Sequence, residues 1–220
     1  MKMRTVFAIA VSLIFCAGIL VPAFGQDMKP IQLPEPKLDK SKPLMQTLKD
    51  RKTTREFSSG NLSQQTLSNL LWAAFGISRP DSGRRTAPSA LNRQEIDVYV
   101  ATAEGTYLYD PKGNALVPVA SGDLRSLTGT QSYFEAAAVN LVYVADLAKM
   151  GEGEEAGKMF LAAADTGFIA ENVYLFCSSE ELATVFRVSI DKPKLGEALK
   201  LSPEQRITGA QTVGLPKPKK

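Results

Sequence analysis

One long helical pattern sets the strongest limit on how this chain can fold. The pattern covers Glu154–Ser178, is rich in alanine and is nearly apolar on every side. A helix that is apolar all round is buried inside a domain or lies at an interface between chains. Within it, Gly167 costs about 0.5–1 kcal/mol relative to alanine, which favours close packing or a ligand at that position. The polar residues Asp165, Thr166 and Asn172 are expected to face a partner chain or to form satisfied hydrogen bonds.

Shorter patterns on both sides of this helix predict the remaining elements. Helices are expected at 45–52, 63–76, 123–128 and 194–199, with Ser63 as an N-cap and Gly76 closing the second helix. Strands are expected at 96–102, 106–109, 115–120, 139–145, 182–188 and 206–213. The strand at 139–145 is continuously apolar, so it is expected to be buried on both faces. Helices mixed with a mostly antiparallel sheet predict the α+β class.

The first 25 residues have the order of a secretory signal peptide. Lys2 and Arg4 precede an apolar run, and Pro22 and small residues follow it, so cleavage is expected after Gly25. The alternatives are an uncleaved membrane anchor, for which the run is shorter than the roughly 20 residues needed, and a lipoprotein modified at Cys16. Export predicts a periplasmic or secreted protein. Cleavage would leave one cysteine, so no internal disulfide is expected.

The processed chain divides into three parts. Residues 26–44 contain four prolines and no apolar periodicity, so they are expected to form an extended arm outside the core. Residues 45–216 form the folded domain, and residues 217–220 form a basic tail.

Composition excludes several kinds of chemistry. The chain has no histidine, which excludes Ser-His-Asp hydrolysis, HExxH zinc sites and histidine-ligated haem. Its 26 basic and 23 acidic residues are too balanced for an electrostatic nucleic-acid binder. Two cysteines are too few for a zinc site, and Cys177 is expected to be a small buried hydrophobe. We therefore expect no metal and no catalytic side chain, and chemistry that depends on a bound cofactor.

Three segments carry groups that could bind such a cofactor. Arg51, Lys52 and Thr53 combine cations with a hydroxyl, which suits a phosphate group, although a solvated charge run has the same composition. Lys217 is a cation that could also reach a phosphate or belong to a solubilising tail. Between them a turn-rich segment contains the remaining candidates, Pro88, Ser89, Ala90 and Asn92. The asparagine amide can donate to and accept from a planar heterocycle, whereas a purely structural loop would use the same residues for turn geometry.

The order of these motifs resembles the nitroreductase superfamily. Residues 51–57 (RKTTREF) are similar to its RRSxRxF entry motif, and residues 67–76 (LSNLLWAAFG) match the helix signature LxxLLWAAxG. Residues 85–90 (RTAPSA) resemble the RTxPSAG segment of the SagB-type, azoline dehydrogenase-like branch. Residues 104–111 (EGTYLYDP) match the hairpin that follows in that branch. The resemblance covers about residues 45–216.

The resemblance implies an α+β fold in a domain-sharing homodimer, with one FMN in each of two interface clefts. It implies that the flavin carries the redox chemistry, with a small-molecule substrate and a separate electron donor. Arg51, Lys52 and Thr53 match positions that bind the phosphate and ribityl chain, and Lys217 matches a late basic ligand. Residues 88–90 match the loop along the ring, and Asn92 falls near the amide at its pyrimidine edge.

Three departures from the family pattern leave a second function open. Leu91 occupies a glycine position, Glu95–Ile96 replaces Pro-Trp, and residues 181–187 replace a glycine-rich segment. The first hypothesis is an exported FMN-dependent oxidoreductase that transfers hydride through flavin N5 to a small electrophilic acceptor. The alternative is a non-catalytic flavin-binding or structural dimeric scaffold of the same fold.

Overall fold

The computed structural model describes residues 28–38, 42–132 and 136–218. The expected signal peptide therefore lies outside the described residues. The helices are α1 (Leu44–Asp50), α2 (Gln64–Phe75), α3 (Glu155–Ser179) and α4 (Lys192–Ala198). The strands are β1 (Ile31–Gln32), β2 (Phe57–Ser58), β3 (Ile77–Arg79), β4 (Arg84–Arg85), β5 (Ile96–Ala101), β6 (Gly105–Asp110), β7 (Ala115–Ser121), β8 (Val139–Asp146), β9 (Ala183–Arg187) and β10 (Gln205–Pro216).

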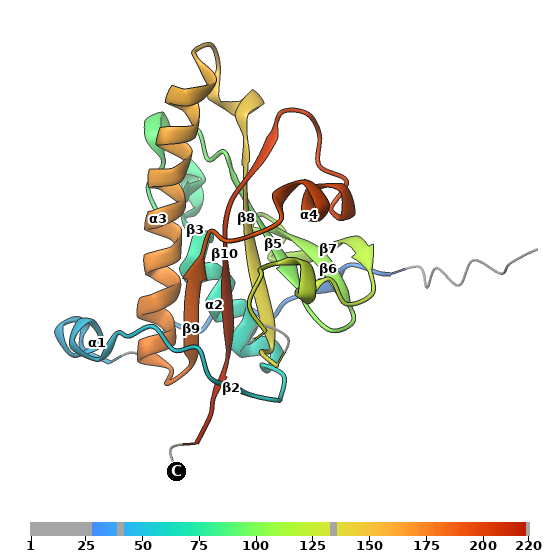
Figure 1. Ribbon diagram of the computed structural model, residues 1–220. Coiled ribbons are helices and arrows are strands. Elements are labelled where there is room, and N and C mark those ends of the chain that lie inside the picture. Colours follow the sequence, from blue (N-terminus) through green and yellow to red (C-terminus); the bar gives the residue numbers. More distant parts are fainter. Residues whose placement is uncertain (1–27, 39–41, 133–135, 219–220) are drawn as a thin grey trace, which may run out of the picture.

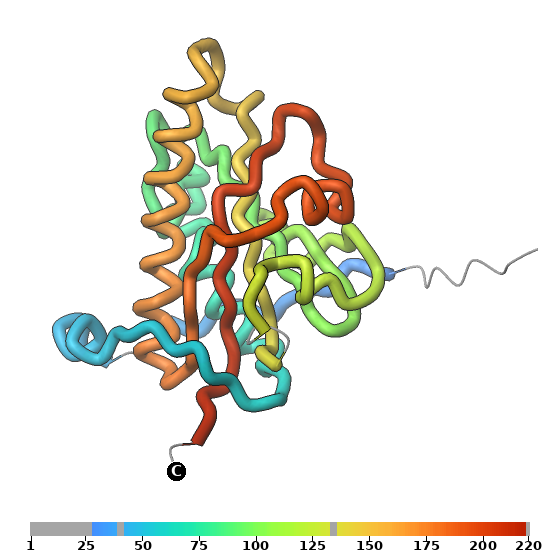
Figure 2. Tube along the Cα trace, in the orientation of Figure 1, coloured from blue at the N-terminus to red at the C-terminus, as the bar shows by residue number. Residues whose placement is uncertain are grey.

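The main sheet is antiparallel in all of its pairings among the described residues. Its order is β1-β7-β6-β5-β8-β10-β2, and β9 also pairs with β10. The last strand is the most connected, because β10 pairs with β8, then with β9, and finally with β2 (Figures 1 and 2). This arrangement confirms the predicted α+β fold with a mostly antiparallel sheet.

Strand β8 is buried on both faces, as its continuous apolar sequence predicts. On one face Leu141 and Tyr143 join a core built with α2 and α3. On the other face Val142 and Val144 pack with α4. The sheet therefore lies between α2 and α3 on one side and α4 on the other (Figure 1).

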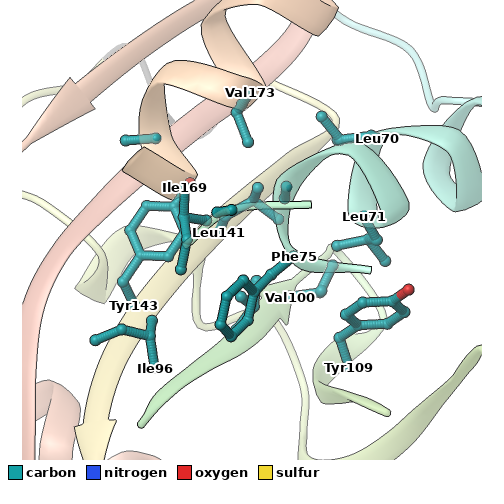
Figure 3. Close-up of a cluster of buried hydrophobic side chains, with 14 of the residues drawn as sticks. Leu70, Leu71, Phe75, Ile96, Val100, Tyr109, Leu141, Tyr143, Ile169 and Val173 are labelled. Carbon is teal, nitrogen blue, oxygen red and sulfur yellow. The ribbon is translucent and has the colours of Figure 1, made fainter. Parts of the chain in front are cut away.

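The larger core lies between α2, α3 and the sheet. Leu70, Leu71 and Phe75 of α2 face Ile169 and Val173 of α3 across the side chains of β8, and each is at most 3% exposed (Figure 3). Full burial of such a side chain contributes about 1.5–3 kcal/mol. This packing fixes α3 against the sheet, and α3 in turn positions both candidate regions described below.

The predicted ends of α2 are confirmed. The Ser63 hydroxyl accepts a hydrogen bond from the Thr66 N–H at 3.0 Å, which caps the first turn. At the other end, the Gly76 N–H donates to the Trp72 carbonyl at 2.8 Å. The helix expected at 123–128 is shorter than predicted, because only a 3₁₀ turn at Arg125–Leu127 forms there.

The described part of the proline-rich arm is extended, but it is not separate from the core. Strand β1 pairs with β7, and Leu33 is 3% exposed within the main hydrophobic cluster. The Ser68 hydroxyl donates to the Pro34 carbonyl at 2.5 Å, which ties the arm to α2. The expectation that the arm lies outside the core is therefore wrong for this segment.

Candidate functional site

The predicted phosphate-binding residues lie on an extended segment between α1 and β2. Helix α1 ends at Asp50, two residues earlier than expected, so Arg51, Lys52 and Thr53 are not helical. The segment is held to the sheet because the Thr54 N–H donates to the Thr184 carbonyl of β9 at 2.9 Å. The side chains on either side of Thr54 are therefore presented from a fixed backbone.

The end of β10 brings Lys217 to the same place. Pro216 pairs with Phe57 across the β10–β2 ladder, and the Lys217 N–H approaches the Glu56 carbonyl at 3.4 Å. Two basic segments far apart in the sequence become neighbours through this pairing. The sequence pattern predicted both segments, but it left open whether Lys217 was part of a site or of a tail.

A pocket of about 830 Å³, called here the basic pocket, opens between these segments. Its lining includes Lys52, Thr53, Arg55 and Lys217, together with the carboxylates of Asp50, Glu56 and Glu181. None of the ion pairs formed within residues 28–38, 42–132 and 136–218 involves the three cations in this set. Cations without a charged partner beside a hydroxyl are suited to bind a phosphate group.

Tyr174 of α3 orients the amino-terminal side of the basic pocket. Its hydroxyl accepts a hydrogen bond from the Phe186 N–H at 2.9 Å and lies 3.2 Å from the Thr53 hydroxyl. The Arg51 guanidinium lies over the Tyr174 ring, 5.4 Å from its centroid, and does not line the basic pocket. Tyr174 was not among the residues predicted from the sequence, because a tyrosine in a largely apolar helix resembles any other core residue.

The second predicted region is the loop at residues 88–92, called here the Ser89 loop. The Ser89 hydroxyl accepts from the Gln94 N–H at 3.0 Å, and the Asn92 N–H donates to the Ser89 carbonyl at 2.9 Å. The Ala90 N–H donates to Asp165 Oδ2 of α3 at 2.8 Å. These bonds close the loop on itself and hold it against α3, while Pro88 and Asn92 are exposed.

The Ser89 loop contains conformations that are unfavourable for ordinary residues. Leu91, Asn92 and the adjoining Gln94 have φ values of 54°, 54° and 50°. The left-handed region is costly for residues with a β-carbon, and Leu91 gains little in return because it is 83% exposed. Glycine at this position, as in the family pattern, would avoid the cost.

The two predicted regions do not meet within one chain. Thr53 contacts Tyr174, whereas Ala90 contacts Asp165, nine residues earlier on the same helix. Nine residues correspond to two and a half turns, so the two contacts lie on opposite sides of α3 and roughly 13 Å apart along it. The basic pocket is not lined by the Ser89 loop, and a second pocket of about 590 Å³ beside α1 is lined by neither region.

One side of α3 packs against the rest of the chain, and the other side, called bare below, is exposed to solvent. Thr166 illustrates the covered side, because its hydroxyl donates to the Ala162 carbonyl and pairs with the Thr208 hydroxyl at 2.8 Å. On the bare side Phe160 is 76% and Phe168 is 49% exposed, with three small residues between them. This surface is called here the α3 face, and it comprises Phe160, Ala163, Ala164, Gly167 and Phe168. A β-carbon added at Gly167 would meet open space, so packing within the chain does not explain this glycine.

The structure also defines the surroundings of Cys177 and Asn172, two further residues considered from the sequence. Cys177 is completely buried, and burial raises the pKa of its thiol, so it remains protonated and unreactive. Asn172 lines the second pocket of about 590 Å³, between α1, α2 and α3.

No group of three or more His, Cys, Asp and Glu side chains suited to a metal ion occurs in the described ranges. In the same ranges, every helix is too short or too polar to span a membrane.

The segment that replaces the family's glycine-rich stretch forms strand β9. Thr184 is 2% exposed, and its hydroxyl accepts from Gln211 Nε2 at 3.2 Å. The strand is thus a paired part of the sheet beside the basic pocket, and Thr184 also lines that pocket.

Comparisons with known proteins agree on one family. A family profile described as "Nitroreductase family" matches residues 48–215. "Putative nitroreductase MJ1384" of Methanocaldococcus jannaschii is 27% identical over 185 residues, which cover 80% of this chain and 91% of that protein. The crystal structure of "a putative nitroreductase" from Ralstonia eutropha JMP134 is 40% identical, with a TM-score of 0.83, and the match covers 90% of this chain and 94% of that one.

A more distant likeness concerns the fold alone. The structure of the Escherichia coli microcin synthetase McbBCD complex contains a chain that is 22% identical to this one, with a TM-score of 0.66. The match covers 97% of this chain and 85% of that chain.

Proposed function

The chain belongs to the nitroreductase family, and from this premise we propose that it is an FMN-dependent oxidoreductase. The observation that carries the proposal is the basic pocket. It combines three cations that lack ion-pair partners among the described residues with the Thr53 hydroxyl, and its volume of about 830 Å³ is within the range of cofactor sites.

The residues of the basic pocket fit the phosphate end of FMN. Lys52 and Lys217 would provide charge-assisted hydrogen bonds to phosphate oxygens from two sides. The Tyr174 hydroxyl accepts from a backbone amide, so its own proton can be donated to Thr53. The Thr53 proton then remains available for the phosphate or ribityl oxygens. Arg51, matched by resemblance to the same end of FMN, would have to leave the Tyr174 ring to reach it.

The Ser89 loop would hold the other end of the cofactor. Pro88, Ser89 and Ala90 would lie along the flavin ring, and the exposed Asn92 amide would face its pyrimidine edge. When bound, FMN supplies two-electron hydride transfer at N5, a chemistry that amino-acid side chains do not provide. The protein's part is to bind and orient the ring and to admit a donor and a small electrophilic acceptor in turn.

A complete site requires two copies of the chain. The basic pocket and the Ser89 loop lie on opposite sides of α3, so one chain cannot place both against one cofactor molecule. The α3 face is apolar, contains Gly167 in open space and is suited to pack against a second copy. We propose a homodimer with two interface clefts, each built from the basic pocket of one chain and the Ser89 loop of its partner.

The test is FMN binding by the purified protein, followed by absorbance and titration. Lys52→Ala and Lys217→Ala each remove one charge-assisted hydrogen bond, so FMN affinity is expected to fall roughly ten- to hundredfold in each variant. Lys112→Ala, in the turn between β6 and β7, is the matched control and should bind like the parent protein. A colourless protein that does not bind added FMN would contradict the proposal.

One observation favours the alternative function, a non-catalytic flavin-binding or structural scaffold. Strand β9 replaces a glycine-rich segment with side chains such as the buried Thr184, which limits close approach of the backbone to the ring. The two functions differ in turnover. If FMN binds tightly but the bound flavin is not reduced by NADH, NADPH or a reduced quinone, the scaffold is favoured. Ping-pong turnover would favour the enzyme.

We also propose that the protein is exported and belongs to the SagB-type branch. The charge and hydropathy order of residues 1–25 supports export to the periplasm or beyond. Residues 85–90 and the β6–β7 hairpin support the branch. Cell fractionation and N-terminal sequencing of the isolated protein test export, and a mature chain that begins at Gln26 is expected.

A further inference from the structure

Glu95 is a buried carboxyl group that the proposed function does not use. It stands between the Ser89 loop and β5, and its side chain is fully buried. Its carbonyl accepts from the Asp146 N–H at 2.9 Å, which fixes its backbone at the sheet. Within the described residues, neither carboxyl oxygen receives a hydrogen bond of normal geometry. A buried ionised carboxylate without hydrogen bonds is strongly unfavourable, so this group requires an explanation.

The neighbouring group is a second buried carboxyl. Asp165 of α3 is 4% exposed and accepts the hydrogen bond from the Ala90 N–H at 2.8 Å. The Glu95 carboxyl lies within hydrogen-bonding reach of Asp165, and Arg93 is the nearby cation. Two ionised carboxylates within hydrogen-bonding reach of each other repel strongly. One proton shared between them replaces the repulsion with a hydrogen bond.

The electrostatic surroundings agree with such a shared proton. Burial, and to a smaller extent the neighbouring Asp165, raise the pKa of Glu95 to about 7, against the opposing effects of its own backbone N–H and of the Arg93 charge. Glu95 therefore keeps its proton through the mildly acidic range in which an ordinary glutamate is ionised.

We propose that Glu95 is a positioning residue that, as a neutral carboxylic acid, donates a hydrogen bond to Asp165 and so fixes the Ser89 loop against α3 through the Ala90 amide. The loop needs this anchor because three residues at or beside it have left-handed backbone conformations. The consequence for the cofactor rests on the proposed function, but the anchor itself does not.

The sign of the pH dependence follows from the raised pKa. A glutamate with a higher pKa in the folded than in the unfolded state binds its proton more tightly when folded. Its contribution to stability is complete below the unfolded pKa of about 4.5 and is lost as the pH rises through about 7. Above that pH the Glu95 carboxyl loses its proton, and its charge repels the neighbouring Asp165 and weakens the anchor on Ala90.

The first experiment compares unfolding of the parent protein and Glu95→Gln across this range. Glutamine imitates the protonated acid and cannot titrate. Between about pH 5 and pH 8 the folded-to-unfolded ratio of the parent is expected to fall roughly a hundredfold relative to Glu95→Gln. Glu152→Gln changes an exposed carboxylate, so it should retain the profile of the parent. Identical profiles for the parent and Glu95→Gln would overturn the proposal.

A second variant and two direct measurements address the anchor. In Asp165→Asn the new amide can donate to an ionised Glu95 and still accept from Ala90. Glu95 remains buried there, so the pH step should become smaller and move to lower pH. Infrared spectra at neutral pH should contain the carbonyl band of a buried carboxylic acid, absent from Glu95→Gln. Hydrogen exchange of the Ala90 amide, corrected for intrinsic rates, should accelerate above about pH 7 in the parent only. No such band and no change in exchange would refute the shared proton.

Titration with FMN separates this proposal from the proposed function. If both hold, FMN affinity falls above about pH 7 in the parent and is unchanged in Glu95→Gln. If FMN does not bind at any pH while the unfolding and exchange results persist, the positioning role stands and the proposed function fails. If FMN binds with the same pH profile in both proteins, the link between Glu95 and the cofactor is wrong.

Discussion

At the scale of single residues, one hydroxyl group connects the sheet to the basic pocket. The Tyr174 hydroxyl accepts a hydrogen bond from the Phe186 N–H and contacts the Thr53 hydroxyl. A residue with no predicted role therefore positions Thr53, which was predicted as a site residue. The role of Tyr174 depends on residues that are close in space but distant in the sequence. Thr53, for example, lies more than a hundred positions before Tyr174. Such a role has no signature in the local sequence.

Tyr174→Phe is expected to lower both stability and FMN affinity. The change keeps the ring under Arg51 but leaves the half-buried Phe186 amide without its acceptor, which costs about 0.5–1.5 kcal/mol in the free energy of unfolding. Chemical denaturation measures this loss. Tyr107→Phe is the control, because the Tyr107 hydroxyl has no hydrogen bond among the described residues, and equal losses in both variants would contradict the role of Tyr174.

Leu91→Gly is expected to stabilise the folded chain. The left-handed conformation costs a leucine about 1–2 kcal/mol, and glycine adopts it freely. This gain exceeds the extra conformational entropy that a glycine loses on folding, which is about 0.5–1 kcal/mol. Little burial is lost, since Leu91 is 83% exposed. Thermal unfolding measures the change. Leu38→Gly, at an exposed leucine outside the left-handed region, should show no gain, and a destabilised Leu91→Gly would mean that Leu91 packs against a partner.

At the scale of secondary structure, the sequence predicts most elements because each has its own periodicity. The hairpin strands, β8, α2 and α3 were predicted close to their observed bounds. The arm was missed because β1 is two residues long and Leu33 is a single apolar residue among prolines. Its burial depends on β7 and α2, which the local pattern does not contain. The element predicted at 123–128 was too long, since only the 3₁₀ turn at Arg125–Leu127 forms, and the end of α1 was predicted two residues too late.

Leu33→Ala is expected to destabilise the protein by about 2–5 kcal/mol, the usual cost of truncating a buried leucine. Urea denaturation provides the measurement. Leu38→Ala lies in the same arm at a residue that is 66% exposed, and its effect should remain within about 0.5 kcal/mol. Similar small effects for both variants would mean that the arm does not contribute to the core.

At the scale of the whole molecule, the sequence predicted two candidate regions but not their separation within the chain. Arg51, Lys52, Thr53 and Lys217 converge around Tyr174 and the basic pocket, whereas the Ser89 loop lies on the far side of α3. The spacing of motifs in a sequence contains no information on which side of a helix each will contact. The family resemblance implies an interface cleft, and the α3 face is the surface that we propose for it.

Ala164→Glu tests that surface. On an exposed helix position the change should alter the stability of one chain by no more than about 0.5 kcal/mol. At a two-fold interface it buries two unpaired charges, so the dissociation constant of the dimer is expected to rise at least about a hundredfold. Analytical ultracentrifugation measures this constant. Ser121→Glu adds the same charge at the end of β7, and a dimer equally weakened by both variants would exclude the α3 face.

The position of β10 has a consequence for when the protein can become complete. This last strand is inserted between β8 and β9, and it ends beside β2, which is formed by residues near the other end of the domain. Until residues 205–216 have left the ribosome, β8 has an open edge and Lys217 is absent from the pocket. The main sheet and the basic pocket are therefore completed together, by the segment of the domain that is synthesised last.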